Sequence, residues 1–315
     1  MEYLKPKIEF YRQRTFSEKM NVTFEFIREN WKPLLKYSFY IIMPVCLVQT
    51  FFMNSFFNVY MNAAINSTRG GGNSFGNSLA SFFWNYGALM FCIMLGSAIM
   101  SGLIYAMMQT YAVRENRLRE VTLSDFKDLL VKNAWKYIRL IFIILFVYIA
   151  LVAIVVSLAV LASIWSLLAT IPILMISILL LIPLMLVFPA YIFEPHITLA
   201  GAIRKAWKLG IATFGGMLGL MVVLYIISSV IQMVTMLPWY LVTVIGAVFS
   251  LTSESTSNPS VIFKFALYIL GLIQSFGAYI SAIIGIVGLA FQYFHAREKV
   301  EGVTIESNIS NFGNL

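Results

Sequence analysis

The chain has 315 residues, a formal charge of +8 and a mean hydropathy of +0.84, with 60% hydrophobic and only 11% charged residues. This balance excludes an ordinary soluble protein and is typical of an integral membrane protein. The positive charge does not indicate nucleic acid as a partner. The Lys and Arg residues lie in short clusters beside apolar stretches, where anionic lipid headgroups account for them.

Residues 1–36 are polar and contain an amphipathic pattern. Apolar residues recur there at helical spacing, at Met20, Phe24, Ile27 and Trp31. The pattern predicts a helix that lies in the membrane interface. Thr15 and Glu18 have the spacing of a capping box that would begin it.

Two apolar spans follow, over about 37–61 and within 82–113. The segment between them, 62–78, is rich in Asn, Ser and Gly and is predicted to be a loop. Small residues recur at every fourth position of the second span, at Ala98, Gly102 and Ala106. They predict a face on which another helix packs closely.

The basic segment 114–139 resembles the N-terminal one. Thr122 and Asp125 repeat the capping-box spacing. A second, shorter amphipathic helix is predicted from an apolar stripe at Phe126, Leu129, Leu130, Asn133/Ala134 and Tyr137.

The longest apolar stretch runs from Leu140 to Phe193 and contains no charged residue or histidine. A single helix of this length would measure roughly 80 Å, whereas the hydrocarbon core of a bilayer is about 30 Å thick. The stretch therefore predicts spans 3 and 4, with a turn near Ser163–Pro172.

A third amphipathic helix is predicted over 197–213, and span 5 over about 214–237, with Gly215 and Gly219 as a packing pair. Residues 238–251 are apolar but too short to span. They extend span 5 beyond a kink at Pro238, or form a re-entrant or interfacial segment.

Span 6 is predicted over 263–286, after a polar loop at 252–260, and continues as a helix into 292–301. Its small residues form one stripe, at Gly277, Ser281 and Gly285.

Together these elements predict an all-α, polytopic integral membrane protein with six transmembrane helices. The three interfacial segments begin alike, with Thr15, Thr122 and Thr198, and each precedes an apolar hairpin. We interpret them as three repeated units of interfacial helix plus helical hairpin. The regions are a polar segment over 1–36, a membrane domain over 37–296 and a tail over 297–315.

Charge predicts the orientation. Among the 22 Lys and Arg residues, all but Arg69 and Lys264 fall on the side that holds both termini. By the positive-inside rule this side is cytoplasmic.

The sequence shows no catalytic, cofactor or metal constellation. The only cysteines, Cys46 and Cys92, fall in spans, which predicts neither a disulfide nor a zinc site. His196 follows Glu194 by two residues, and this pair fits either a helix start or, with less support, a hydrolytic or metal site.

The six predicted cores contain no Asp, Glu, Lys or Arg, which argues against ion coupling through a buried carboxylate. The spans do contain neutral polar residues, at Gln49, Asn85, Gln109, Gln232 and Gln274. These residues either form hydrogen bonds between helices or line a path for a substrate.

One stretch carries a family resemblance. Residues 197–208, Ile-Thr-Leu-Ala-Gly-Ala-Ile-Arg-Lys-Ala-Trp-Lys, with Phe214 and a Gly-rich span after them, resemble the six-helix membrane domain attached to some bacterial glycerophosphodiester phosphodiesterases and its stand-alone relatives. Ser17–Tyr37 is similar to that family's opening segment. The resemblance covers most of residues 15–300 and implies a bacterial inner-membrane protein. It does not imply the phosphodiesterase activity, because the metal-binding carboxylates of the catalytic domain have no counterpart here.

Three functions fit these observations. The first is a non-enzymatic membrane protein whose interfacial helices dock on lipid, a protein partner or a second copy through Phe24, Trp31, Trp135 and Trp207. The second is a permease or lipid-handling transporter for an uncharged or amphipathic substrate. The third is an intramembrane enzyme centred on Glu194 and His196.

Overall fold

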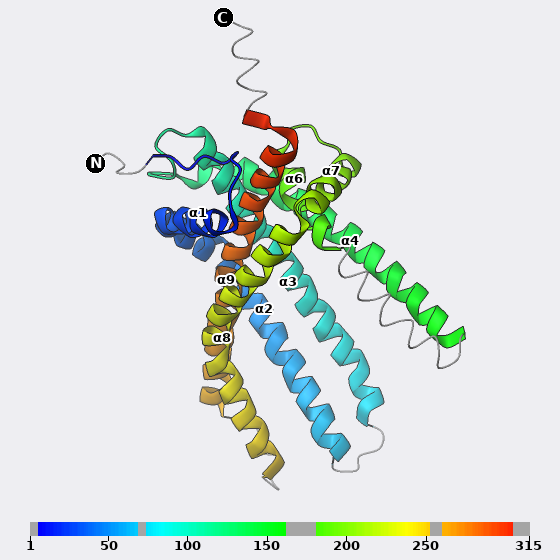
Figure 1. Cartoon of the computed structure of the whole chain (residues 1–315). Coiled ribbons are helices and arrows are strands. Elements are labelled where there is room, and N and C mark those ends of the chain that lie inside the picture. The colour runs from blue at the N-terminus through cyan, green and yellow to red at the C-terminus, as the bar shows by residue number, and fades with distance from the viewer. Residues whose placement is uncertain (1–5, 69–73, 162–180, 253–259, 305–315) are drawn as a thin grey trace, which may run out of the picture. The chain divides into compact units, whose positions relative to one another are not determined.

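The structure is a computed structural model that describes residues 6–68, 74–161, 181–252 and 260–304. All regular secondary structure in these residues is helical (Figure 1). The elements are α1 (Phe16–Glu29), α2 (Trp31–Thr68), α3 (Ser74–Val113), the 3-10 turn η1 (Leu123–Asp125), α4 (Lys127–Leu161), α6 (Val187–Phe193), α7 (Leu199–Ala212), α8 (Phe214–Thr252) and α9 (Val261–Glu301).

Five of these helices are long and apolar enough to cross a bilayer. Their candidate spans are Trp31–Ala64, Leu79–Val113, Lys127–Ala150, Phe214–Phe249 and Val261–Glu301. The prediction of an all-helical membrane protein with several spans is therefore confirmed. The predicted turn at 163–172 and most of span 4 lie outside the described residues.

The chain forms two compact units, each built from separate stretches. Unit 1 comprises Met1–Pro33, Ser101–Tyr225 and Ile284–Leu315; unit 2 comprises Leu34–Met100 and Ile226–Ile283. Unit 1 has an aromatic core in which Phe10 packs on Tyr111, Phe291 and Phe294, with ring centroids 5.0–5.9 Å apart. Unit 2 has an apolar core with a few polar bonds, such as Trp239 Nε1 to Asn54 Oδ1 at 3.0 Å.

Threonine begins each amphipathic segment, at the N-caps of α1, η1 and α7. The capping box of α1 is confirmed: Thr15 N–H donates to Glu18 at 2.7 Å, and Glu18 N–H donates to Thr15 Oγ1 at 3.4 Å. The first of these bonds holds the pKa of Glu18 below its usual value. At η1, Thr122 N–H donates to Asp125 at 2.8 Å.

Three boundaries differ from the sequence prediction. The segment 62–78 is not one loop, because α2 continues to Thr68 and α3 begins at Ser74. The second amphipathic helix is not separate, because no Pro or Gly interrupts the chain between Lys127 and Leu161, and α4 is continuous. The segment 238–251 extends α8, which passes through Pro238 without ending. Among the alternatives for that segment, the extended span is the correct one.

The small residues of the spans differ in their surroundings. Ala98, Gly102 and Ala106 are buried. A Cβ added at Gly102 would lie 2.9 Å from the backbone nitrogen of Ala134, so α3 and α4 approach closely there.

In unit 2, a Cβ at Gly277 would overlap the Thr235 side chain, and Ser281 is buried and donates to the Ala278 carbonyl at 2.8 Å. Gly219 is only in ordinary contact with Phe16. A Cβ at Gly215 or Gly285 would meet no atom of the described residues within 4 Å, so these two glycines make no close helix contact in that part of the chain.

The close contact at Gly102 predicts a difference between two Gly→Ala substitutions. Gly102→Ala should lower the free energy of unfolding by about 1–3 kcal/mol, because the added methyl meets the α4 backbone. Gly285→Ala should be neutral or stabilising by up to about 1 kcal/mol, because space is open there and Ala favours a helix. Thermal unfolding of the detergent-solubilised variants measures both. Equal destabilisation would contradict the close approach of α3 and α4.

Candidate functional site

The four aromatic residues predicted to dock all belong to unit 1, and their side chains are exposed. The exposed fractions are 36% for Phe24, 51% for Trp31, 59% for Trp135 and 38% for Trp207. In each segment the other face packs on the protein: Phe26 of α1, Ala134 of α4 and Ala206 of α7 are buried. These helices therefore carry two apolar faces, one against the protein and one free.

Basic side chains accompany the exposed aromatics. Lys32 lies over the Trp31 ring, with its Nζ 5.7 Å from the ring centroid. Further exposed cations on these helices are Arg28, Lys132, Arg139, Arg204 and Lys208. Aromatic rings beside Lys and Arg are the composition expected at the headgroup level of a membrane.

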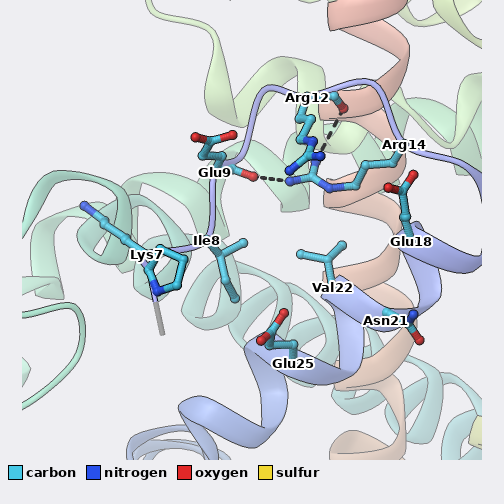
Figure 2. Close-up of a pocket in the computed structure, with 10 residues that line it drawn as sticks. Lys7, Ile8, Glu9, Arg12, Arg14, Glu18, Asn21, Val22 and Glu25 are labelled. Atoms are coloured by element: carbon cyan, nitrogen blue, oxygen red, sulfur yellow. Dashed lines mark hydrogen bonds between the residues drawn. The ribbon is translucent and has the colours of Figure 1, made fainter. Parts of the chain in front are cut away.

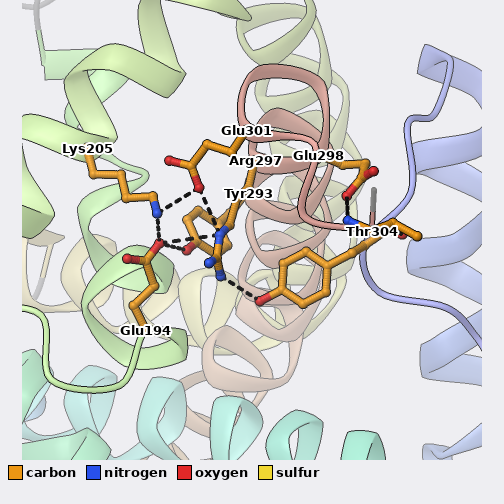
Figure 3. A network of polar contacts seen from close by, with 8 residues as sticks. Glu194, Lys205, Tyr293, Arg297, Glu298, Glu301 and Thr304 are labelled. Carbon is orange, nitrogen blue, oxygen red and sulfur yellow. Dashed lines mark hydrogen bonds and ion pairs between the residues drawn. The ribbon is translucent and has the colours of Figure 1, made fainter. Parts of the chain in front are cut away.

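A polar cluster joins the end of α9 to α7 and to the segment after α6 (Figure 3). Glu194 Oε1 lies 2.5 Å from Lys205 Nζ and accepts a 2.5 Å hydrogen bond from Tyr293 Oη. Glu301 Oε2 lies 2.8 Å from Lys205 Nζ and 3.0 Å from Arg297 Nε. Arg297 Nη1 also donates to Tyr11 Oη at 3.0 Å.

The charges in this cluster balance, with two carboxylates against two cations. Each charged group is already paired, and no nucleophile or proton acceptor is free to act on a substrate. The cluster therefore fixes the end of α9 to α7.

His196 does not join Glu194 in a site. Its side chain is exposed, and no hydrogen bond or ion pair of His196 occurs among the described residues. Its φ of 62° is a left-handed conformation that separates α6 from α7. The pair therefore marks a helix boundary, the structural reading that the sequence favoured.

A pocket of about 340 Å³ lies between the N-terminal segment and α1 (Figure 2). Its charged lining is mixed: Lys7, Arg12, Arg14, Glu9, Glu18 and Glu25. Arg14 is turned back into the chain, where its guanidinium donates to the carbonyls of Phe10 at 2.9 Å and of Glu9. In the part of the chain that the structure describes, no group of three or more His, Cys, Asp or Glu residues could hold a metal.

The neutral polar residues of the spans have different surroundings. Gln49 accepts from Tyr279 at 2.5 Å, and Gln109 accepts from Asn133 at 2.9 Å, so both link helices. Asn85 donates within its own helix to Ser81, and Gln232 is exposed. The Gln274 Oε1 atom is buried and has no hydrogen-bond partner among the described residues.

Sequence reasoning missed Lys19, which it grouped with the other flanking cations. The side chain is only 3% exposed and belongs to the protein-facing stripe of α1, with Val22, Thr23 and Phe26. The spacing of these residues by three and four was visible in the sequence. The charge of Lys19 concealed the pattern, because Lys is seldom buried.

Comparison of the chain with protein-family models, with curated proteins and with solved structures finds no match. The functional argument therefore starts from the geometry of the helices and their side chains.

The polar cluster predicts a stability effect at Glu194. Glu194→Ala should lower the free energy of unfolding by about 2–4 kcal/mol, because Lys205 and Arg297 then share one carboxylate. His196→Asn, which keeps a residue tolerant of positive φ, should have no measurable effect. Thermal unfolding in detergent distinguishes the two, and a stable Glu194 variant would refute the structural role of the cluster.

Proposed function

We propose that this is a non-enzymatic, multi-pass protein of the bacterial inner membrane that docks on lipid or a partner through three cytoplasmic interfacial segments: α1, the beginning of α4, and α7. The observation that carries the proposal is the exposed aromatic face on each amphipathic segment, opposite a face already packed on the protein. Such a face is unfavourable in water and favourable in the headgroup region.

The proposal includes six spans in three repeated units, with span 4 in the part of the apolar stretch 140–193 that follows the predicted turn at 163–172. Equal element lengths support the repeat: α1 and α7 are 14 residues each. A single capping residue, Asn30 or Thr213, then separates each from the next long helix, which begins at Trp31 or Phe214. Phe24 and Trp207 occupy equivalent positions in this alignment.

Orientation follows from charge. Arg69 and Lys264 are the only Lys or Arg residues on the side opposite the termini. Under the positive-inside rule both termini are cytoplasmic. The resemblance of residues 197–208 to the membrane domain of bacterial glycerophosphodiester phosphodiesterases supports the bacterial location.

A permease or lipid-handling transporter is the second candidate, and the unpaired Gln274 oxygen favours it. A buried amide oxygen without a donor is costly in a span and is a suitable acceptor for a polar substrate. Flux of an uncharged or amphipathic solute into proteoliposomes, lost in Gln274→Leu and retained in Gln232→Leu, would support this candidate over the docking protein.

Tryptophan fluorescence tests the docking proposal. In variants that keep one Trp and replace the others by Phe, Trp31, Trp135 and Trp207 should be quenched strongly by lipids labelled near the headgroup, because their rings are exposed in the proposed interfacial segments or at the start of α2. Trp239, which is buried and bonded to Asn54, is the control and should respond little. Quenching of the three residues by aqueous acrylamide alone would argue against membrane docking.

Topology is tested by labelling. With Cys46 and Cys92 replaced by Ser, single cysteines introduced near Tyr11 and near Thr304 should react with an impermeant maleimide only after the inner membrane is opened. A cysteine at Lys264 should react in intact spheroplasts. Opposite behaviour of the two termini would refute an even number of spans.

A further inference from the structure

Lys19 is a buried cation without a counter-ion. Its Nζ donates one hydrogen bond, to Gln292 Oε1 of α9 at 2.8 Å, and Gln292 in turn donates to Thr213 Oγ1 at 3.1 Å. No carboxylate among the described residues lies within ion-pair distance of this Nζ. An ammonium group has three donors, so two of them have no acceptor among the residues that the structure describes.

The acidic residues that precede Lys19 and Lys299 in the sequence are engaged elsewhere. Glu18 caps α1 by accepting from Thr15, and Glu298 accepts from Thr304 N–H at 3.1 Å. The next charge along the same face of α9 is a second cation, Lys299. Burial, and then the proximity of Lys299, lower the pKa of Lys19. The protein therefore maintains a buried positive site that a negative ligand would stabilise.

The first turn of α8 faces this cation. A Cβ added at Gly216 would lie 3.4 Å from Lys19 Nζ. Thr213 is the residue before α8, and the N–H groups of Phe214, Gly215 and Gly216 have no acceptor among the described hydrogen bonds. Gly215 and Gly216 are exposed, and without side chains they leave these donors open to a ligand.

These features concentrate positive charge in one place. The N-terminus of a helix has a partial positive charge, and a Lys beside it is unfavourable unless an anion lies between them. Backbone N–H groups and an ammonium around one point are the donors that bind phosphate.

We propose that Lys19 and the first turn of α8, with Lys299 nearby, form a binding site for a phosphate group. The phosphate belongs to an anionic phospholipid headgroup or to a soluble phosphate compound. The first case deepens the proposed docking function and rests on it. The second does not require docking.

The test uses the full-length protein with three variants. Lys19→Met removes the cation. Gly216→Asp keeps the cation and supplies an internal carboxylate in place of the phosphate ligand, at a helix position where Asp is favoured. Lys264→Met removes an exposed Lys from α9 and is the matched control. Thermal unfolding is followed in neutral detergent with inorganic phosphate against chloride at equal ionic strength. It is repeated in nanodiscs of phosphatidylcholine with and without phosphatidylglycerol.

The wild type and Lys264→Met should be stabilised by phosphate, by phosphatidylglycerol or by both. Lys19→Met should weaken the apparent affinity by about tenfold or more. Gly216→Asp should unfold at a higher temperature without ligand and lose the response. This variant keeps the test informative if Lys19→Met fails to fold.

A response to both ligands supports a site for phosphate from either source. Stabilisation by phosphatidylglycerol alone assigns the site to a lipid headgroup, and stabilisation by phosphate alone assigns it to a soluble compound. No response in the wild type, or an undiminished response in Gly216→Asp, would overturn the proposal. Lys19→Met and Gly216→Asp both retain Phe24, Trp31, Trp135 and Trp207. The docking proposal, tested by Trp quenching with labelled lipids, can therefore fail or succeed separately from the phosphate site.

Discussion

The cost of placing charge in hydrocarbon is the constraint on which the rest of the structure depends. In unit 2 the only charged residues in the sequence are Lys36, Arg69, Glu254 and Lys264. The ion pairs of the described residues all lie in unit 1, where Glu29, Glu194 and Glu301 meet Arg and Lys partners. Polar contacts in unit 2 are between neutral groups, such as Thr50 and Ser275. Among the described residues, ion pairs are thus confined to unit 1, as expected if the spans of unit 2 lie in hydrocarbon.

The polar side chains of unit 1 hold the amphipathic segments on the ends of the long helices. Arg117 pairs with Glu29 at 2.7 Å beside Tyr111, and Arg14 N–H donates to His295 Nδ1 at 3.0 Å. These bonds use one face of each segment. Exposed aromatic residues remain on the rest of each segment, and the proposed docking on lipid or a partner rests on them.

Lys19 has a neutral side-chain partner. Buried Arg117 pairs with Glu29, and buried Arg14 donates to backbone carbonyls, whereas the described hydrogen bond of the Lys19 ammonium goes to the side-chain amide of Gln292. An uncompensated buried charge lowers stability unless something binds it. For this reason a buried ammonium beside a helix N-terminus indicates a ligand more strongly than an exposed basic patch does.

The sequence by itself determined the helical membrane class, the capping of α1 and the face of α4 that packs inward. Apolar length, Thr–Glu spacing and 3.6-residue periodicity are local properties, and each sets a local free energy. It also indicated the exposed aromatics Phe24 and Trp31, because both lie on the apolar stripe that the same period predicts.

Only the tertiary structure decided which glycines are close contacts, with Gly102 and Gly277 at an interface and Gly215 and Gly285 outside one. It also decided that Glu194 pairs with Lys205 rather than His196, and that Lys19 is buried against α9. These outcomes depend on which helix lies opposite, and that neighbour is set by contacts between different elements, from 11 positions apart for Glu194 and Lys205 to 273 for Lys19 and Gln292, which no local pattern contains.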